Sequence, residues 1–286
     1  MGRGTPKARH CLEPWPVIAG VMQELPSPTP HVRAFLDGSI GWLVLNRPKR
    51  RNALNRAMWA AIPPLMKLLD DSVDVRAIVI RGAGSEAFAA GADISEFAAA
   101  RADANAARDY EALNGAAFAA IRNSPKPVIA MIEGFCIGGG LAIALACDLR
   151  VTGASGIFAL PPARLGLAYP VDGLRDLLAA VTPAIAKEML FTARRLDAAE
   201  ALRVGLVNRV AADAEKEVRA LCAEIAAGAP LTIQHSKRAI AAISGSPGAA
   251  SPADLARLAA QCFDSADYAE GCAAFLKKRK PVFRGE

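Results

Sequence analysis

A run of three glycines, Gly138 to Gly140, leads directly into an apolar, alanine-rich stretch that ends at Asp148. Such a turn brings bare backbone N–H groups close to a ligand, and the N-terminus of the following helix carries partial positive charge. The N–H of Gly139 can therefore hold an oxygen atom that becomes negative during a reaction. An ordinary tight strand-to-helix connection would have the same sequence, so the triplet alone leaves both interpretations open.

The segment "AFAAGAD", residues 87–93, has the same character: a strand end, small residues and a helix start. The N–H of Ala92 can supply a second donor from this turn. Two such turns aimed at one point form an oxyanion hole, usually the largest electrostatic contribution to acyl chemistry. Backbone donors stabilise charge but move no proton, so the chemistry must need little help from a side-chain base.

The patterns around these turns predict an α/β core followed by an α-helical region. Two short strands joined at Asp37-Gly38 form a hairpin signal. Asn55 is a candidate N-cap for a helix over 56–71, which Pro63 and Pro64 should bend or interrupt. Further strands are expected in "VRAIVIRGAG", "PVIAMIEG" and "LRVTG", and helices over about 100–122, 173–181, 183–192, 197–204, 213–227, 230–243, 252–264 and 265–276. We expect a flexible N-terminal extension over 1–30, a core over 31–212 and a C-terminal helical region over 213–286.

The composition limits the kind of ligand and the compartment. The 286 residues are 53% hydrophobic and 22% charged, as in soluble globular proteins, and a net charge of +6 favours an anionic ligand. The six cysteines show no C-x-x-C spacing and the chain has only three histidines, so we expect reduced, buried thiols and neither a zinc site nor disulfides. No apolar run is long enough to span a membrane and no secretory signal is evident, which predicts a cytoplasmic protein.

Six stretches, in this order and separation, resemble the crotonase superfamily, the enoyl-CoA hydratase/isomerase fold. They are "LNRPKRRNALN" (45–55), "AFAAGADISEF" (87–97), "KPVIAMIEGFCIGGGLAIALACDLR" (126–150), "FALPPARLGL" (158–167), "AKEMLFTARRLDAAEALRVGLVNRV" (186–210) and "DYAEGCAAFLKKRKPVF" (267–283). The resemblance covers about 31–286. It implies a crotonase-like ββα spiral core, a C-terminal α-helical oligomerisation region, and a homotrimer or a dimer of trimers.

The resemblance also implies the site. The N–H groups of Ala92 and Gly139 would form the oxyanion hole, and coenzyme A would be bound as part of an acyl-CoA substrate, with no separate cofactor and no metal. The residues implied to contact the CoA lie along 51–53, along 90–94 and in the glycine turn: Arg51, Ala53, Ala90, Asp93, Ile94 and Gly138. Phe275 and Lys278 would reach the adenine end of a CoA bound by a neighbouring subunit. The alternative for this basic run is a solvated tail, and without an aromatic stacking platform it does not predict nucleic-acid binding.

The two glutamates with which hydratases of this family activate water are absent. Their positions are Ala142 and Pro162 here, and neither residue can move a proton. An aspartate that some isomerases and dehalogenases of the family carry falls at Pro170. Asp172 lies two residues later, and we expect it to cap a helix that starts near Gly173.

Tyr169 is the proton-bearing side chain in the same loop. The stretch "LGLAYPVDGL" and two of the matching stretches resemble methylmalonyl-CoA decarboxylases, in which the matching tyrosine lines the acyl pocket. An aromatic residue of the core or rim is the alternative for Tyr169. This chain departs from the decarboxylase pattern, which has a histidine at the position of Ala92 and a glutamate at the position of Ala142. The resemblance therefore indicates malonyl-type thioesters as a class and not methylmalonyl-CoA in particular. Arg164 is the candidate cation for the carboxylate that leaves.

The leading prediction is an acyl-CoA lyase that works through a thioester enolate, with decarboxylation as its reaction. Loss of CO₂ from a malonyl-type thioester needs no base, because the electrons of the carboxylate form the enolate. One alternative is a hydratase or isomerase that uses unconventional groups, such as Tyr169, Asp172 or Glu133. The other is a non-catalytic acyl-CoA-binding pseudoenzyme.

Overall fold

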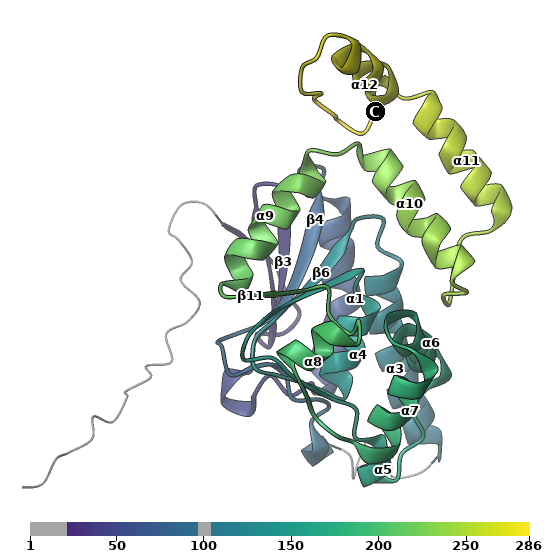
Figure 1. Ribbon diagram of the computed structural model, residues 1–286. Helices are drawn as coiled ribbons and strands as arrows, with labels where there is room; N and C mark the ends of the chain where they lie inside the picture. Colours follow the sequence, from purple (N-terminus) through teal and green to yellow (C-terminus); the bar gives the residue numbers. More distant parts are fainter. Residues whose placement is uncertain (1–21, 97–103) are drawn as a thin grey trace, which may run out of the picture.

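The computed structural model describes residues 22–96 and 104–286, and two sheets form the centre of the fold. The larger sheet has the order β1-β2-β3-β4-β6-β8-β11, antiparallel over β1–β3 and parallel from β3 onward (Figure 1). Its strands are β1 (Gln23–Leu25), β2 (Val32–Asp37), β3 (Ile40–Leu45), β4 (Ala77–Gly82), β6 (Val128–Ile132), β8 (Leu149–Gly153) and β11 (Arg209–Ala211). The smaller sheet has the order β10-β9-β7-β5, from β5 (Ala87–Ala89), β7 (Phe135–Ile137), β9 (Ile157–Ala159) and β10 (Leu196–Asp197). The predicted α/β class is confirmed.

The start of the chain is more ordered than the sequence indicated. β1 pairs with β2, and Thr29 is only 8% exposed, so part of the expected extension over 1–30 belongs to the sheet. Residues 1–21 lie outside the described residues. The hairpin forms as expected, with Gly38 at φ +56° in the turn between β2 and β3.

Helix α1 (Arg56–Asp71) begins at its predicted cap but is not interrupted. The Asn55 side chain accepts a hydrogen bond from the Met58 N–H, 3.0 Å away. The helix then runs through Pro63 and Pro64 without interruption. The burial of one face, which includes Trp59, Ile62 and Leu65, stabilises the continuous helix, and Pro64 lies on the exposed side.

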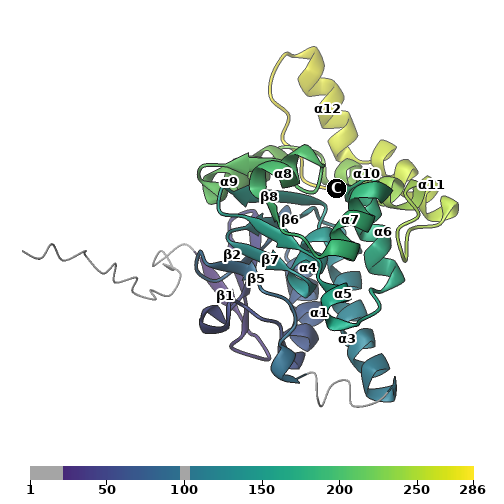
Figure 2. The ribbon, with the colours of Figure 1, turned by 60° about the horizontal axis from the view of Figure 1, so that its bottom comes forward.

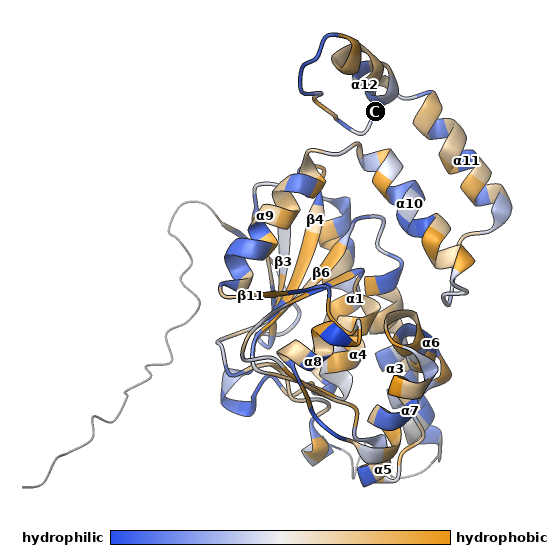
Figure 3. Cartoon of the chain, viewed as in Figure 1, coloured by the Kyte–Doolittle hydropathy of each residue, from blue (hydrophilic) through white to orange (hydrophobic). Residues whose placement is uncertain are grey.

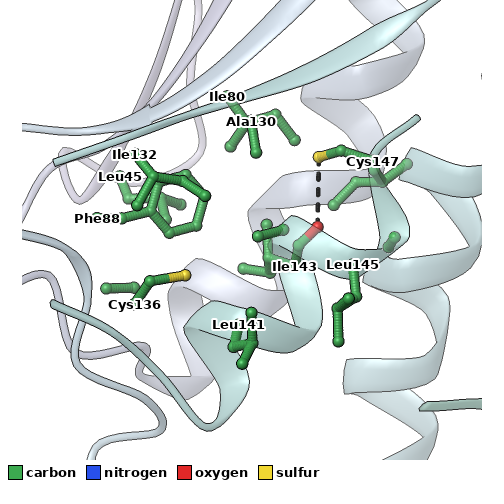
Figure 4. Close-up of a cluster of buried hydrophobic side chains, with 14 of the residues drawn as sticks. Leu45, Ile80, Phe88, Ala130, Ile132, Cys136, Leu141, Ile143, Leu145 and Cys147 are labelled. Atoms are coloured by element: carbon green, nitrogen blue, oxygen red, sulfur yellow. Dashed lines mark hydrogen bonds between the residues drawn. The ribbon is translucent and has the colours of Figure 1, made fainter. Parts of the chain in front are cut away.

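Helix α4 (Gly139–Ala146) is apolar throughout and lies in the centre of the core, between the larger sheet and the helices α1, α3 (Ala104–Arg122) and α6 (Val171–Ala180). Figure 4 shows Leu141, Ile143 and Cys147 in one apolar cluster with Ile80 and Ala130 of the larger sheet and Phe88 of β5 on its far side. Figure 3 shows the hydrophobic strands of the larger sheet above α4. Because α4 is surrounded by apolar side chains, the turn at its N-terminus is held rigidly.

Three cysteines behave as predicted. Cys136, Cys147 and Cys222 are buried free thiols, and burial raises the pKa of each, to about 12 for Cys222. Cys272 is exposed instead, and Cys11 lies outside the described residues.

The predicted C-terminal helices are all present, with bounds within about two residues of expectation. They are α6, given above, and α7 (Pro183–Thr192), α8 (Ala198–Arg203), α9 (Ala214–Ala226), α10 (Pro230–Ile243), α11 (Pro252–Phe263) and α12 (Ala266–Leu276). The short helix α5 (Pro162–Leu165) was not predicted. The last three extend away from the sheets (Figures 1 and 2). The Lys237 ammonium pairs with Asp148 at 2.8 Å, and Arg76 donates to the carbonyl of Phe283 at 2.9 Å, which anchors this region to the core.

Candidate active site

The two turns singled out in the sequence meet in the structure. A Cβ built on Gly139 would lie 3.5 Å from the nitrogen of Ala92, and one built on Gly91 would lie 3.8 Å from the nitrogen of Gly139. Gly91 also has φ +101°, a conformation that a residue with a side chain rarely adopts. The glycines therefore let two backbone segments approach so closely that the N–H groups of Ala92 and Gly139 become neighbours.

The hydrogen bonds around Ala92 show which way its N–H is turned. Leu54 donates to the carbonyl of Gly91 and accepts from the N–H of Asp93, both at 2.8 Å, so Leu54 and Ala92 form a parallel bridge. In such a bridge the N–H of the central residue points away from the partner strand. Gly139 is the first residue of α4, so its N–H has no acceptor within the helix. Both donors are thus available to a ligand.

Asn52 holds this arrangement in place, and the sequence analysis missed it. Its side chain accepts from the N–H of Arg47 at 2.9 Å and donates to the carbonyls of Ala83 and Ala87 at 3.0 and 2.7 Å. It is 1% exposed and has φ +55°, a region that asparagine tolerates better than most residues. An Asn within a basic loop is a weak signal, because only the fold shows which carbonyls it reaches.

A cavity of about 660 Å³ opens in front of the two donors. Its walls come from Trp59 of α1, from α3, from the glycine turn and from residues 160–173. Trp59 packs directly against the turn that carries the Gly139 N–H, because a Cβ built on Gly139 would come within 3.1 Å of the Trp59 ring. The Trp59 ring is fixed by a 3.1 Å hydrogen bond to Tyr110 and by an edge-to-face contact with Phe118.

The positions of the missing carboxylates do face this cavity. Ala142 and Pro162 both line it, as does Pro170. Two of the proposed replacements are unsuitable. Glu133 accepts from Ser155 at 2.7 Å and is not among the residues that line the cavity. Asp172 does line it, but its side chain is 62% exposed and lies 3.6 Å from Arg175.

Asp172 is also not the cap that we predicted. Helix α6 begins at Val171, with Pro170 in the N-cap position, so Asp172 lies in the first turn. Because proline fixes its own φ, it can lead into a helix without a side-chain cap.

Tyr169 lines the cavity with its hydroxyl oxygen buried and without a hydrogen-bond partner among the described residues. Its ring packs on Gly173, where a Cβ would lie 2.8 Å from a ring carbon. Burial, and then the nearby Asp176 carboxylate, raise the pKa of the Tyr169 phenol above its ordinary value. Tyr169 is therefore a neutral hydroxyl at any physiological pH and can donate a proton but not act as a base.

Helix α3 contributes polar residues that the sequence analysis did not identify. Glu111, Asn114 and Phe118 all line the cavity, and their spacing of three and four residues places them on one face of the helix. Asn114 is 8% exposed, and its buried Oδ1 has no hydrogen-bond partner among the described residues. The sequence feature that could have indicated these residues is a Glu and an Asn, three residues apart, in a helix rich in alanine.

The remaining predicted residues lie in two groups. Ala90, Ile94 and Gly138 line the cavity near the hole, and Arg164 lines it farther along, with its Nη2 3.4 Å from the Thr192 carbonyl. Ala53 is not among the residues that line the cavity, and its carbonyl accepts a hydrogen bond from Arg47 at 2.7 Å.

The charged residues of the loops have protein partners. Arg51 pairs with Glu86 at 2.6 Å and lies over the Phe135 ring, and Asp93 pairs with Arg47 at 2.9 Å. The hydrogen bonds from Ser95 and Arg47 lower the pKa of Asp93.

Phe275 and Lys278 lie at the end of α12, away from this cavity (Figure 1), and Phe275 is 84% exposed. Contact with a CoA in a neighbouring subunit stays a prediction. Within residues 22–96 and 104–286 no group of three His, Cys, Asp or Glu side chains could hold a metal ion. In the same ranges no helix has the length and apolar character needed to cross a bilayer.

The fold and the paired donors beside an apolar cavity define a crotonase-superfamily acyl-CoA enzyme. Residues 36–286 match the enoyl-CoA hydratase/isomerase family, and the chain belongs to it. The short-chain-enoyl-CoA hydratase of Clostridium acetobutylicum is 32% identical over 85% of this chain and 94% of its own. The crotonyl-CoA hydratase of Syntrophomonas wolfei is 35% identical over 84% and 93%.

A solved structure titled enoyl-CoA hydratase/carnithine racemase, from Magnetospirillum magneticum, superimposes with a TM-score of 0.85. It is 39% identical, and the match covers 91% of this chain and 97% of that one. These comparisons support the superfamily, and nothing in them points to methylmalonyl-CoA decarboxylases specifically.

Proposed function

We propose that this protein stabilises the enolate of an acyl-CoA thioester between the N–H groups of Ala92 and Gly139, and that its reaction is decarboxylation of a malonyl-type thioester. One observation carries the proposal. The two donors face a cavity in which both positions of the hydratase glutamates, Ala142 and Pro162, lack a group that can move a proton.

Decarboxylation suits these residues because it needs no base. The bond between the α-carbon and the carboxylate breaks, CO₂ leaves, and the electron pair of that bond forms the enolate. The N–H groups of Ala92 and Gly139, with the dipole of α4 behind them, stabilise the negative oxygen. The apolar walls keep water out and increase the strength of these interactions. The enolate α-carbon then takes a proton from the Tyr169 hydroxyl or from water.

The coenzyme A portion would enter past the loops 51–53 and 90–94, with its phosphates near the basic residues around Arg51. No cofactor beyond the CoA of the substrate is required. A homotrimer or a dimer of trimers belongs to the same proposal, because Phe275 and Lys278 can approach a CoA only from another subunit if they approach one at all.

A hydratase or isomerase reaction is the second candidate, and Glu111 is the observation that favours it. Glu111 is a carboxylate that lines the cavity, although at a position different from those of the family glutamates. A base there could activate water or remove an α-proton. The two relatives described above are named as hydratases, which agrees with this candidate.

Mass spectrometry of a thioester panel separates the candidates. We would incubate the protein with malonyl-, methylmalonyl-, crotonyl- and longer enoyl-CoA and compare wild type with Glu111→Gln. Loss of CO₂ from a malonyl-type thioester that survives in Glu111→Gln, with crotonyl-CoA untouched, supports decarboxylation. Addition of water to an enoyl-CoA that disappears in Glu111→Gln supports the second candidate and overturns the first. Binding without any change of mass would identify a pseudoenzyme.

A further inference from the structure

The cavity wall formed by α3 is not purely apolar, although an alkyl chain would need only apolar contacts. Asn114 is more than nine-tenths buried, yet its side chain makes no hydrogen bond to the described residues and its Oδ1 is an orphan. Buried polar atoms in native proteins nearly always have a partner, so an orphan at a ligand cavity needs an explanation. A bound molecule that supplies the missing hydrogen bond provides one.

The alternative ligand, a plain hydrocarbon chain, would meet a penalty at this wall. It would pack against the amide and offer no hydrogen bond to it. Tyr169 lines the same cavity, and its buried hydroxyl is also without a partner among the described residues, so the penalty would apply at two walls. A hydroxyl group on the acyl chain both donates and accepts, and it can therefore pair with the amide in either orientation of the Asn114 side chain.

The position of Asn114 along α3 indicates where this hydroxyl lies. Phe118 packs on Trp59, the residue directly behind Gly139, and so marks the thioester end of the cavity. Asn114 lies four residues earlier, about 6 Å along the helix axis. An acyl chain of about four or five carbons covers that distance.

We propose that Asn114 is a specificity-determining residue and that the site takes acyl-CoA thioesters with a hydroxyl at the fourth or fifth carbon in preference to alkyl chains of equal size. This inference rests on the proposed binding of acyl-CoA but not on which reaction follows. Leaving a buried amide unpaired corresponds to about a tenfold to hundredfold loss of affinity.

Calorimetric titration of the full chain with matched thioesters tests the inference. The pairs are 4-hydroxybutanoyl- against pentanoyl-CoA and 5-hydroxypentanoyl- against hexanoyl-CoA, in which a hydroxyl replaces a methyl group. We expect wild type to bind the hydroxylated member of at least one pair about tenfold or more tightly. Asn114→Leu, which is similar in size, should lose this preference by binding the hydroxylated member more weakly and the alkyl member more tightly.

Two further variants keep the outcome interpretable. Asn123→Leu makes the same change at an exposed position just beyond α3 and should leave the preference intact. Asn114→Ser keeps a polar group and should retain part of it, even if Asn114→Leu fails to fold. Equal affinities within both pairs in wild type, or a preference that survives in Asn114→Leu, would overturn the role of Asn114. Failure of wild type to bind any acyl-CoA would instead overturn the proposed function and remove the basis of this inference.

Discussion

At the residue scale, the chemistry that we propose depends on two backbone N–H groups, which ordinary side-chain substitutions cannot remove. Gly139→Pro can remove one of them. Proline is well tolerated at the first position of a helix, which is where Gly139 lies in α4. Gly139→Ala is the matched control, because it keeps the N–H while placing the same Cβ against the Trp59 ring.

We expect kcat/KM of Gly139→Pro to lie about 10²–10³-fold below that of Gly139→Ala, the usual effect of losing one oxyanion donor. The measurement is the turnover of whichever thioester the panel identifies as a substrate. Equal activity of the two variants would show that the N–H of Gly139 does not contact the reacting oxygen.

Tyr169 gives a second prediction at this scale, for the pH profile. Because burial favours the neutral phenol, the folded-state pKa of Tyr169 lies above its ordinary value of 10.0, so the hydroxyl stays protonated as the pH rises to 10. The kcat of wild type should therefore show no loss from deprotonation of Tyr169 between pH 7 and 10. Tyr169→Phe should lower kcat about tenfold to hundredfold, since water can partly replace the donor. A wild-type profile that falls with a midpoint well below pH 10, and is flat in Tyr169→Phe, would contradict this.

At the scale of elements, the loops 46–54 and 83–93 must be clamped together for the N–H of Ala92 to face the cavity. Asn52 supplies the clamp with three buried hydrogen bonds. Asn52→Ala would leave the N–H of Arg47 and the carbonyls of Ala83 and Ala87 unpaired and would place alanine at φ +55°. We expect it to lower the free energy of unfolding by about 2–4 kcal/mol, measured by urea denaturation. Asn123→Ala, at an exposed position, should change it by less than about 0.5 kcal/mol.

The helices and the glycine turns could be predicted from sequence because their signals are local. Asn55, Ser251 and Ser265 each accept a backbone N–H at the start of a helix, as their positions indicate. The strands of the smaller sheet have only two or three residues, too few for an alternating pattern, and none of its pairings was predicted. Pro63 and Pro64 misled us because the burial that keeps α1 continuous comes from the tertiary structure.

In the candidate site, too, some residues could be predicted from sequence and others could not. The paired turns were recognisable because small residues between a strand end and a helix start occur twice, in the order and separation of the family. The α3 wall was not, because Asn114 acquires its meaning only when the helix is placed against residues 160–173. Similarly, no sequence signal distinguishes Glu111, which lines the cavity, from Glu133, which does not.

At the scale of the whole molecule, the last three helices carry large apolar side chains that residues 22–96 and 104–286 leave exposed. Ile243 is 87% exposed, Phe275 84% and Phe263 66%, on the region that extends from the core (Figure 2). Several large apolar side chains exposed on one region of a protein are typical of an association site. The expected partner is another copy of the chain, in a trimer or a dimer of trimers.

Light scattering coupled to size-exclusion chromatography tests this prediction. Three chains of 29.9 kDa have a mass of about 90 kDa, and six about 180 kDa. Ile243→Glu combined with Phe275→Glu should shift wild type from one of these masses to the monomer, because association would bury two new charges. Val73→Glu is the matched control, since Val73 is 89% exposed in the connection between α1 and β4, outside these helices. The variant Phe275→Ala separates two roles of this side chain. If Phe275 also contacts the CoA of a neighbouring subunit, the variant should bind CoA more weakly even where it remains a trimer. If Phe275 acts in assembly alone, a trimer of the variant should bind CoA as wild type does.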